Sequence, residues 1–277
     1  MSLRWLVCRR VERRISRINC VGISIGLALR LKILDATNTT RDRRKLLMEF
    51  CKNLMHEPPF RVFFVESVCD DPVIINSNIT HGESEYNQIG RLGGDSPLSA
   101  NGLKYAGKLR EYFENEDLDD FRVWSSQKIR AAQTAAHLKD LAGHTEFWKC
   151  LDEIDAGICE GLTYEDFESR YPKQFAERDK DKYHYRYPSG ESYEDLVARL
   201  EPVIMELERQ SNVLVISHQA VLRCILAYFT NKNRDDLPYL KVPLHTVIKL
   251  TPKAYSCEVE LFKFDINAVD TYREKPK

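Results

Sequence analysis

The feature that most constrains the fold is an alternation of short apolar runs with amphipathic stretches over most of the chain. A Val-Leu-Val-Ile run within 212–217 predicts a buried strand. A helix with a leucine- and isoleucine-rich face is predicted before it, over 193–209, and another helix after it, over 221–229. Such alternation is typical of α/β proteins whose mostly parallel sheet carries helices on both faces. We therefore expect that architecture.

Further elements of the same pattern are predicted elsewhere. We expect helices over 98–113, with Ser99 as the N-cap, and over 129–141. Short strands are expected over 122–125 and 247–250. A strand over 73–79 is expected to be weak, because the polar residues Asn76, Ser77 and Asn78 interrupt its apolar pattern.

The N-terminal region has a different character. A strand ending at 33–35, a charged helix over 41–54 and a strand over 62–67 predict a strand–helix–strand unit too small to fold well alone. Before it, six arginines and a single glutamate precede an apolar run over 18–29, which is too short to span a bilayer. This start has two readings: a poorly conforming terminus of a cytosolic protein, or a mitochondrial presequence.

Charge and cysteine usage exclude some classes of site. The formal net charge of −1 neither indicates nor excludes nucleic-acid binding, so any basic site must be local. Eight cysteines are scattered without a C-x-x-C pair, which argues against a zinc site, and a chain of 277 residues needs no disulfides.

Two histidines lie where a parallel sheet gathers functional groups, just past the carboxyl ends of predicted strands. His81 follows the strand over 73–79, and His218 follows the strand over 212–217. A neutral imidazole can attack phosphorus, and Gly82 would let the backbone approach a phosphate group closely. A lone histidine here is more often structural, but two at strand-to-helix switches favour a site.

Two further residues suit phosphate chemistry. Arg130 lies at the start of a predicted helix, and its planar guanidinium fits phosphate oxygens. Glu153 can protonate a leaving alcohol. From composition and spacing alone, Arg130 also fits a solvated helix residue, and Glu153 an ordinary acidic loop with Asp152 and Asp155.

Four motifs in a fixed order resemble the histidine phosphatase superfamily, which implies a phosphoglycerate mutase-like α/β fold. They are H-G-E-S-E-Y-N from His81, S-x-x-x-R-x-x-Q-T around Arg130, D-E-I-D-A-G around Glu153 and V-I-S-H-Q around His218. Longer segments such as R-L-G-G-D-S and L-P-Y-L-K-V-P-L-H more closely resemble the bisphosphatase half of the 6-phosphofructo-2-kinase/fructose-2,6-bisphosphatase family. The resemblance covers nearly all of 81–273.

Upstream, D-A-T-N-T-T-R-D-R-R and F-F-V-E-S-V-C-D-D-P resemble two pieces of the kinase half of that family. The rest of the kinase is missing, and no G-x-x-x-x-G-K-[ST] phosphate loop occurs in the chain. We therefore predict three parts: an unmatched basic N-terminus at 1–29, a truncated kinase remnant at 30–72 and a histidine phosphatase domain at 73–277.

The resemblance implies a role for each matched residue. His81 is implied to be the nucleophile that becomes phosphohistidine, His218 to steady the transferring phosphoryl group and Arg130 to clamp it. Glu153 is implied to be the general acid that protonates the sugar oxygen, and Asn87 to contact phosphate. The residues implied to hold the sugar and its second phosphate are Tyr164, Arg178, Lys182, Tyr193, Gln219 and Arg223. In the kinase remnant, the residues implied to lie near fructose 6-phosphate are Asp35, Thr37 and Arg43.

The implied activity is hydrolysis of fructose 2,6-bisphosphate to fructose 6-phosphate and phosphate, in control of glycolysis and gluconeogenesis. No metal or other cofactor is implied, because ATP and Mg²⁺ belong to the family's kinase half. The expected partners are these sugar phosphates and a full-length family member, with neither nucleic acid nor membrane, in the cytoplasm.

One position departs from the family pattern. The superfamily has Arg directly before the nucleophilic histidine, and this chain has Thr80. Three readings follow: an impaired phosphatase, an inactive truncated form that binds fructose phosphates or a full-length partner, and a splice form or faulty gene model that does not fold stably. A related mutase is disfavoured, because R-D-K-D-K-Y-x-Y-R-Y-P favours a sugar bisphosphate.

Overall fold

The computed structural model describes residues 76–116, 118–252 and 257–275, and the backbone of three short N-terminal strands. The chain forms two compact units, Met1–Asp70 with Lys253–Tyr255, and Asp71–Pro252 with Ser256–Lys277. In the first unit, β1 (Trp5–Val7) pairs in parallel with both β2 (Lys32–Ile33) and β3 (Arg61–Val62). The predicted helix over 41–54 and most of the strand over 62–67 lie outside the described residues. The division into three parts at 29/30 and 72/73 stays a prediction.

The second unit is built on a six-stranded sheet of order β6-β5-β7-β4-β8-β9. The neighbours from β6 to β4 run parallel, whereas β8 pairs antiparallel with both β4 and β9. The bounds are β4 Asn76–Thr80, β5 Arg122–Ser125, β6 His144–Phe147, β7 Val213–Ser217, β8 Thr246–Pro252 and β9 Cys257–Lys263. The predicted α/β class with a mostly parallel sheet is confirmed.

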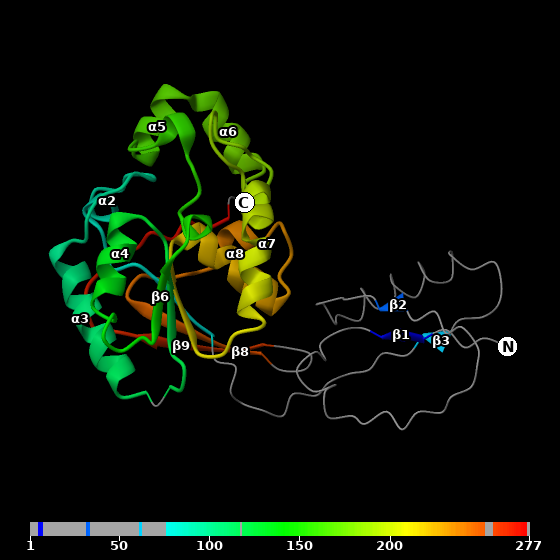
Figure 1. Cartoon of the computed structure of the whole chain (residues 1–277). Helices are drawn as coiled ribbons and strands as arrows, with labels where there is room; N and C mark the ends of the chain where they lie inside the picture. The colour runs from blue at the N-terminus through cyan, green and yellow to red at the C-terminus, as the bar shows by residue number, and fades with distance from the viewer. Residues whose placement is uncertain are drawn as a thin grey trace, which may run out of the picture. The chain divides into compact units, whose positions relative to one another are not determined.

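Helices cover both faces of this sheet (Figure 1). On one face lie α3 (Ala100–Glu114) and α4 (Ile129–Ala136), and on the other α7 (Tyr193–Leu207) and α8 (Gln219–Thr230). The central strand β7 serves both: Leu214 and Ile216 pack with α3 and α4, and Val213 and Val215 with α7 and α8. Successive side chains of a strand point to opposite faces, so an uninterrupted apolar run suits a sheet buried on both sides.

The helix predictions were right in position and differ at the ends. Ser99 caps α3, since its Oγ accepts from the Gly102 amide at 3.2 Å. α4 ends at Ala136, before the predicted end at 141. Beyond it the chain continues in turns, with the Leu138 amide bonded to the Ala135 carbonyl at 2.9 Å. These turns carry Leu138 into the core and so extend the apolar spacing beyond the helix.

The expected weakness of the strand before His81 was wrong. β4 lies inside the sheet, and from Asn76 to Ile79 it pairs on one side with β7 and on the other with β8. Its five side chains are all buried. The amide Nδ2 of Asn76 donates to the Leu207 carbonyl at 3.4 Å, and Nδ2 of Asn78 to the Asn76 carbonyl at 3.4 Å. Two-sided backbone pairing therefore outweighs the polar sequence in fixing this strand.

A separate group of elements stands beyond the carboxyl ends of the parallel strands. It contains α5 (Tyr164–Arg170) and α6 (Pro172–Lys180) (Figure 1). The two helices pack through an aromatic cluster around the fully buried Phe167. These helices were not predicted, nor were the short α2 (Glu85–Gln88), β6, β9 and the 3₁₀ turns η2 (Lys149–Leu151), η3 (Gly157–Cys159) and η4 (Leu237–Tyr239). Their importance is positional, because α5 and α6 bring three predicted site residues to the sheet edge.

Candidate active site

Two histidines meet at the carboxyl ends of adjacent strands. His81 directly follows β4, and its amide donates to the Ser217 carbonyl of β7 at 3.0 Å. His218 follows β7 and is the N-cap residue of α8. Both are buried, with ring centroids 5.0 Å apart. The parallel pairing of β4 with β7 therefore brings together two histidines that lie far apart in the sequence.

Arg130 joins the two rings. Its Nε donates to His81 Nε2 at 3.0 Å, its Nη2 lies 3.1 Å from His218 Nδ1, and its Nη1 donates to the Gly94 carbonyl at 2.9 Å. A guanidinium offers only donors, so both facing ring nitrogens must carry lone pairs. Arg130 therefore marks the place between the histidines where an anion with acceptor oxygens would sit.

The protonation state of His81 follows from these contacts. Its Nδ1 lies 2.6 Å from the Gly82 carbonyl, which only accepts, so Nδ1 bears the proton and Nε2 the lone pair. Burial, followed by the charge of Arg130, holds the pKa of His81 well below its usual range. The ring is thus a neutral imidazole whose Nε2 faces Arg130, as a nucleophile requires.

Glu153 has the properties of a proton donor. The side chain is partly buried at the cavity, and its Oε1 accepts from the amides of Ile154 at 3.0 Å and Ala220 at 3.3 Å. Burial raises the pKa of this carboxyl against the opposing effect of those amides and of the arginines. A raised pKa increases the protonated fraction available near neutral pH.

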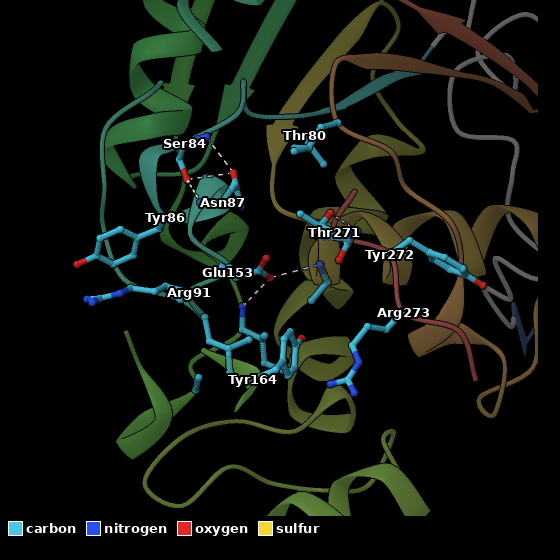
Figure 2. Close-up of a pocket in the computed structure, with 18 of the residues that line it drawn as sticks. Thr80, Ser84, Tyr86, Asn87, Arg91, Glu153, Tyr164, Thr271, Tyr272 and Arg273 are labelled. Atoms are coloured by element: carbon cyan, nitrogen blue, oxygen red, sulfur yellow. Dashed lines mark hydrogen bonds between the residues drawn. The ribbon is translucent and has the colours of Figure 1, made fainter. Parts of the chain in front are cut away.

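The predicted substrate residues line one cavity of about 270 Å³ with His81, Arg130 and Glu153 (Figure 2). Those that line it are Asn87, Tyr164, Arg178, Lys182, Tyr193, Gln219 and Arg223. His218 reaches it through its bond to Arg130. The structure thus gathers six basic side chains around one cavity of a chain whose net charge is −1: Arg91, Arg130, Arg178, Lys182, Arg223 and Arg273. Asp35, Thr37 and Arg43, predicted for the kinase remnant, lie outside the described residues.

Neutral groups hold most of these basic side chains, and Arg178 Nη1 also pairs with Asp179 Oδ1 at 3.1 Å. Arg178 Nε donates to the Tyr187 hydroxyl at 2.8 Å, Arg223 Nη1 donates to the Tyr193 hydroxyl at 3.1 Å, and Lys182 Nζ donates to the Pro238 carbonyl at 3.1 Å. Burial, followed by the charges of neighbouring arginines, lowers the pKa of Lys182 to about 6. Such mutual repulsion suits a polyanionic ligand, which would relieve it.

The motif S-x-x-x-R-x-x-Q-T gains a structural meaning. Thr134 Oγ1 accepts from the Gly82 amide at 3.1 Å and donates to the Arg130 carbonyl at 2.8 Å, so it ties the nucleophile loop to α4. Gly82 is needed for close packing against α3, where a Cβ would lie 2.6 Å from the Gly102 carbonyl. The structure shows this contact with α3 at Gly82, and the approach of its backbone to phosphate stays a prediction.

Sequence reasoning missed the C-terminal segment 269–273, which forms one wall of the cavity (Figure 2). Glu83 accepts from the Val269 amide at 2.9 Å, and Gln219 Nε2 donates to Thr271 Oγ1 at 3.0 Å. The Arg273 guanidinium lies 4.5 Å from the Tyr164 ring centroid. No local pattern predicts this segment, because the described residues after β9, 264–275, form no regular secondary structure.

Among the residues that the structure describes, no helix is long and apolar enough to cross a membrane. Within the same residues, no group of three or more His, Cys, Asp or Glu is arranged to hold a metal ion. The four cysteines described, Cys150, Cys159, Cys224 and Cys257, are free thiols, as predicted for them.

Solved structures share this fold at low sequence identity. Alpha-ribazole phosphatase from Shigella flexneri superposes with a TM-score of 0.62 at 21% identity, over 72% of this chain and all of that one. A mycobacterial glucosyl-3-phosphoglycerate phosphatase superposes with a TM-score of 0.58 at 22% identity, over 70% of this chain and all of that one. These likenesses establish the fold.

Family models and curated relatives identify the sequence family. The model of the histidine phosphatase superfamily (branch 1) matches residues 79–265, and the 6-phosphofructo-2-kinase model matches residues 28–90. A Caenorhabditis elegans 6-phosphofructo-2-kinase/fructose-2,6-bisphosphatase is 46% identical over 323 residues, covering 85% of this chain and 70% of that protein. The Homo sapiens 6-phosphofructo-2-kinase/fructose-2,6-bisphosphatase 1 is 43% identical, covering 88% and 69%. The chain therefore belongs to the histidine phosphatase superfamily and, within it, to the 6-phosphofructo-2-kinase/fructose-2,6-bisphosphatase family.

Proposed function

We propose that the chain hydrolyses fructose 2,6-bisphosphate at its 2-phosphate, releasing fructose 6-phosphate and inorganic phosphate. The observation that carries this proposal is the neutral His81 imidazole, whose Nε2 lone pair faces Arg130 in a cavity lined by further basic residues. One phosphate would meet His81 and Arg130, and the other the group of Arg178, Lys182 and Arg223. A sugar bisphosphate matches two separated groups of positive charge.

The reaction has two in-line steps. In the first, His81 Nε2 attacks phosphorus, the bond from phosphorus to the sugar oxygen breaks, and Glu153 gives that oxygen a proton. In the second, water attacks phosphohistidine, Glu153 takes a proton from the water, and the phosphorus–nitrogen bond breaks to return the lone pair to Nε2. His81 keeps its Nδ1 proton on the Gly82 carbonyl throughout. Phosphate release from fructose 2,6-bisphosphate by the purified chain tests the activity.

A second function is a binder of fructose phosphates without turnover, or a partner of a full-length relative. Thr80 supports it, because it removes one cation from beside His81 while the rest of the cavity keeps its charge. Binding of fructose 2,6-bisphosphate without phosphate release, under conditions where a full-length relative turns over, would favour this function over the phosphatase. On either proposal the chain acts in the cytoplasm on sugar phosphates without a metal.

We expect no synthesis of fructose 2,6-bisphosphate from fructose 6-phosphate and MgATP. A kinase of this type needs a glycine loop and its lysine to cradle the ATP phosphates, and the chain contains no such loop. The kinase model also matches only residues 28–90. Product formation by the pure protein, assayed beside a full-length relative, checks this. Synthesis that rises in proportion to the added protein contradicts it.

We expect bisphosphate binding to take up a proton at pH 8. Phosphate placed beside Lys182 stabilises its ammonium, raising the pKa from about 6 towards its ordinary value. Since binding then favours the protonated form, affinity weakens as pH rises above about 6, by up to about tenfold per pH unit. The second pKa of each phosphate is about 6, so both phosphates are almost fully ionised at pH 8. The proton taken up on binding therefore goes to the protein.

Calorimetry in two buffers of different ionisation enthalpy measures this uptake. Hydrolysis is avoided by using His81→Ala as the background, with His81→Ala/Lys182→Met as its matched partner. We expect roughly one proton in the first protein and a value near zero in the second. Equal uptake by both proteins would assign the proton to another group.

A further inference from the structure

Ser126 occupies a fully buried position between His218 and a carboxylate. Its Oγ lies 2.7 Å from His218 Nε2 and 2.7 Å from Asp152 Oδ1. The Asp152 oxygen also accepts from the Gln127 amide at 2.8 Å. Ser126 is the first residue of the motif around Arg130, and it has no part in the reaction steps above.

The protons along this chain are fixed by counting donors. The Asp152 Oδ1 accepts from two donors, so the single hydroxyl proton of Ser126 is directed to it. The Lys128 amide donates to Ser126 Oγ at 3.1 Å, which uses one of its lone pairs. The remaining lone pair of Ser126 therefore accepts, and the proton between Ser126 and His218 belongs to Nε2 of the ring.

The contact on the opposite side of the His218 ring selects the same protonation state. Its Nδ1 lies 3.1 Å from Nη2 of Arg130, which can only donate, so Nδ1 carries no proton. Burial, followed by the charges of Arg130, His81, Lys128 and Arg199, lowers the pKa of His218, which keeps the ring neutral. Both sides therefore select one tautomer, with the proton on Nε2.

We propose that Ser126 is a positioning residue that, anchored by Asp152, holds His218 as the Nε2–H tautomer and so keeps Nδ1 aimed at Arg130. Without the hydroxyl, Nε2–H loses its acceptor, and Arg130 alone still opposes the Nδ1–H tautomer. In that tautomer two donors, Nδ1–H and the Arg130 Nη2, would face each other at the present separation of 3.1 Å. Their repulsion would displace Arg130, whose Nε contacts the nucleophile His81. The proposal rests on the proposed phosphatase for its effect on rate, but the tautomer does not.

Ser126→Ala tests the role, and Ser125→Ala is the matched control. Ser125 is the neighbouring, equally buried serine, and its Oγ donates to the Ser126 carbonyl without touching a histidine. We expect Ser126→Ala to lower kcat roughly ten- to hundredfold, a loss comparable to that of outer partners of other functional histidines, with a smaller change in KM. Ser126→Thr keeps the hydroxyl and should restore most of the rate.

Nitrogen-15 NMR of histidine-labelled full-length protein reads the tautomer directly, with His218 assigned by its absence in His218→Gln. We expect a protonated Nε2 and a bare Nδ1 in the wild type and in Ser125→Ala, and a shift towards protonated Nδ1 in Ser126→Ala. A wild-type ring with its proton on Nδ1 would overturn the proposal even if Ser126→Ala did not fold. An unchanged tautomer in a folded Ser126→Ala protein would also overturn it. An inactive wild type with the expected tautomer would instead count against the proposed function.

Discussion

His81→Ala should abolish both phosphoenzyme formation and phosphate release from fructose 2,6-bisphosphate. The expected loss of turnover is on the order of 10⁴-fold or more, because removal of a nucleophile elsewhere has cost about 10⁶ in kcat. His81 lines the cavity, and its unprotonated Nε2 faces Arg130, from where its lone pair can reach a bound phosphoryl group. Alanine leaves Arg130 and the other cations in place, so substrate binding should persist.

Rapid mixing with 2-³²P-labelled substrate, followed by an alkaline quench, measures the intermediate, since phosphohistidine is labile in acid. We expect one labelled residue per chain in the wild type and none in His81→Ala. Glu153→Gln is the control, because it removes proton donation to the leaving oxygen while keeping the side-chain size. That variant should still label His81, more slowly. Labelling of His81→Ala to the wild-type level would rule out His81 as the residue that accepts the phosphoryl group.

The parts of the fold that sequence predicted are those where one physical signal dominates. β7 is an uninterrupted apolar run because both of its faces are buried, and α7 keeps helical spacing along a fully buried stripe. The apolar pattern did not predict the order of β4, since its Asn76, Ser77 and Asn78 are polar yet buried. Its order comes from pairing with β7 and β8, which no local pattern can reveal.

The residues of the candidate site also divide into those that a physical signal in the sequence predicted and those that it did not. His81 and His218 were predicted to lie together because strand ends of a parallel sheet meet at one edge, and the structure brings them together. The binding residues on α5 and α6 came from family resemblance alone, because those helices pack on their own aromatic cluster. Ser126 was part of a recognised motif but had no assigned role, since its meaning depends on a bond to Asp152 across 26 residues.

Replacement of Thr80 by arginine should raise the rate by at least about tenfold. In sequence, the histidine phosphatase superfamily has Arg directly before its nucleophilic histidine, and this chain has Thr80. Loss of one charge-assisted donor to a transition state typically costs roughly 10²–10³ in rate. The Thr80 side chain is 2% exposed, lines the cavity and, among the described residues, its Oγ1 has no hydrogen-bond partner. Threonine thus offers one neutral hydroxyl where the family has a bidentate cation.

The pairing of β4 determines whether an arginine at position 80 can be held at the cavity. A poorly ordered strand before His81 would not hold the new side chain there, whatever its charge. Thr80 is instead paired with Ser217 in β7, and the next residue, His81, is bonded to the same serine. Thr80 and Thr271 of the C-terminal segment both line the cavity (Figure 2). The backbone is therefore fixed, and the experiment tests the side chain.

Three variants separate charge from size. Thr80→Arg supplies both charge and the planar fork, Thr80→Lys supplies charge alone, and Thr80→Gln fills space without charge. We expect kcat to rise in the order Gln, Lys, Arg, with Gln near the wild type, because the added donors act mainly on charge that develops in the transition state. An equal gain in Thr80→Gln would assign the effect to packing. No gain in a folded Thr80→Arg protein would show that the missing charge does not limit the site.

Thr80→Arg should lower the stability of the ligand-free protein. Five arginines already line the cavity, so a sixth adds repulsion. The pKa of Lys182, lowered first by burial and then by neighbouring arginines, shows that such repulsion is already present. Inorganic phosphate should offset it, because an anion that binds only the folded state stabilises it by mass action. We therefore expect Thr80→Arg to melt below the wild type without phosphate and to gain more in Tm than the wild type when phosphate is added. Equal gains in the two proteins would mean that the new guanidinium does not reach the phosphoryl site, and the rate increase should then be absent as well.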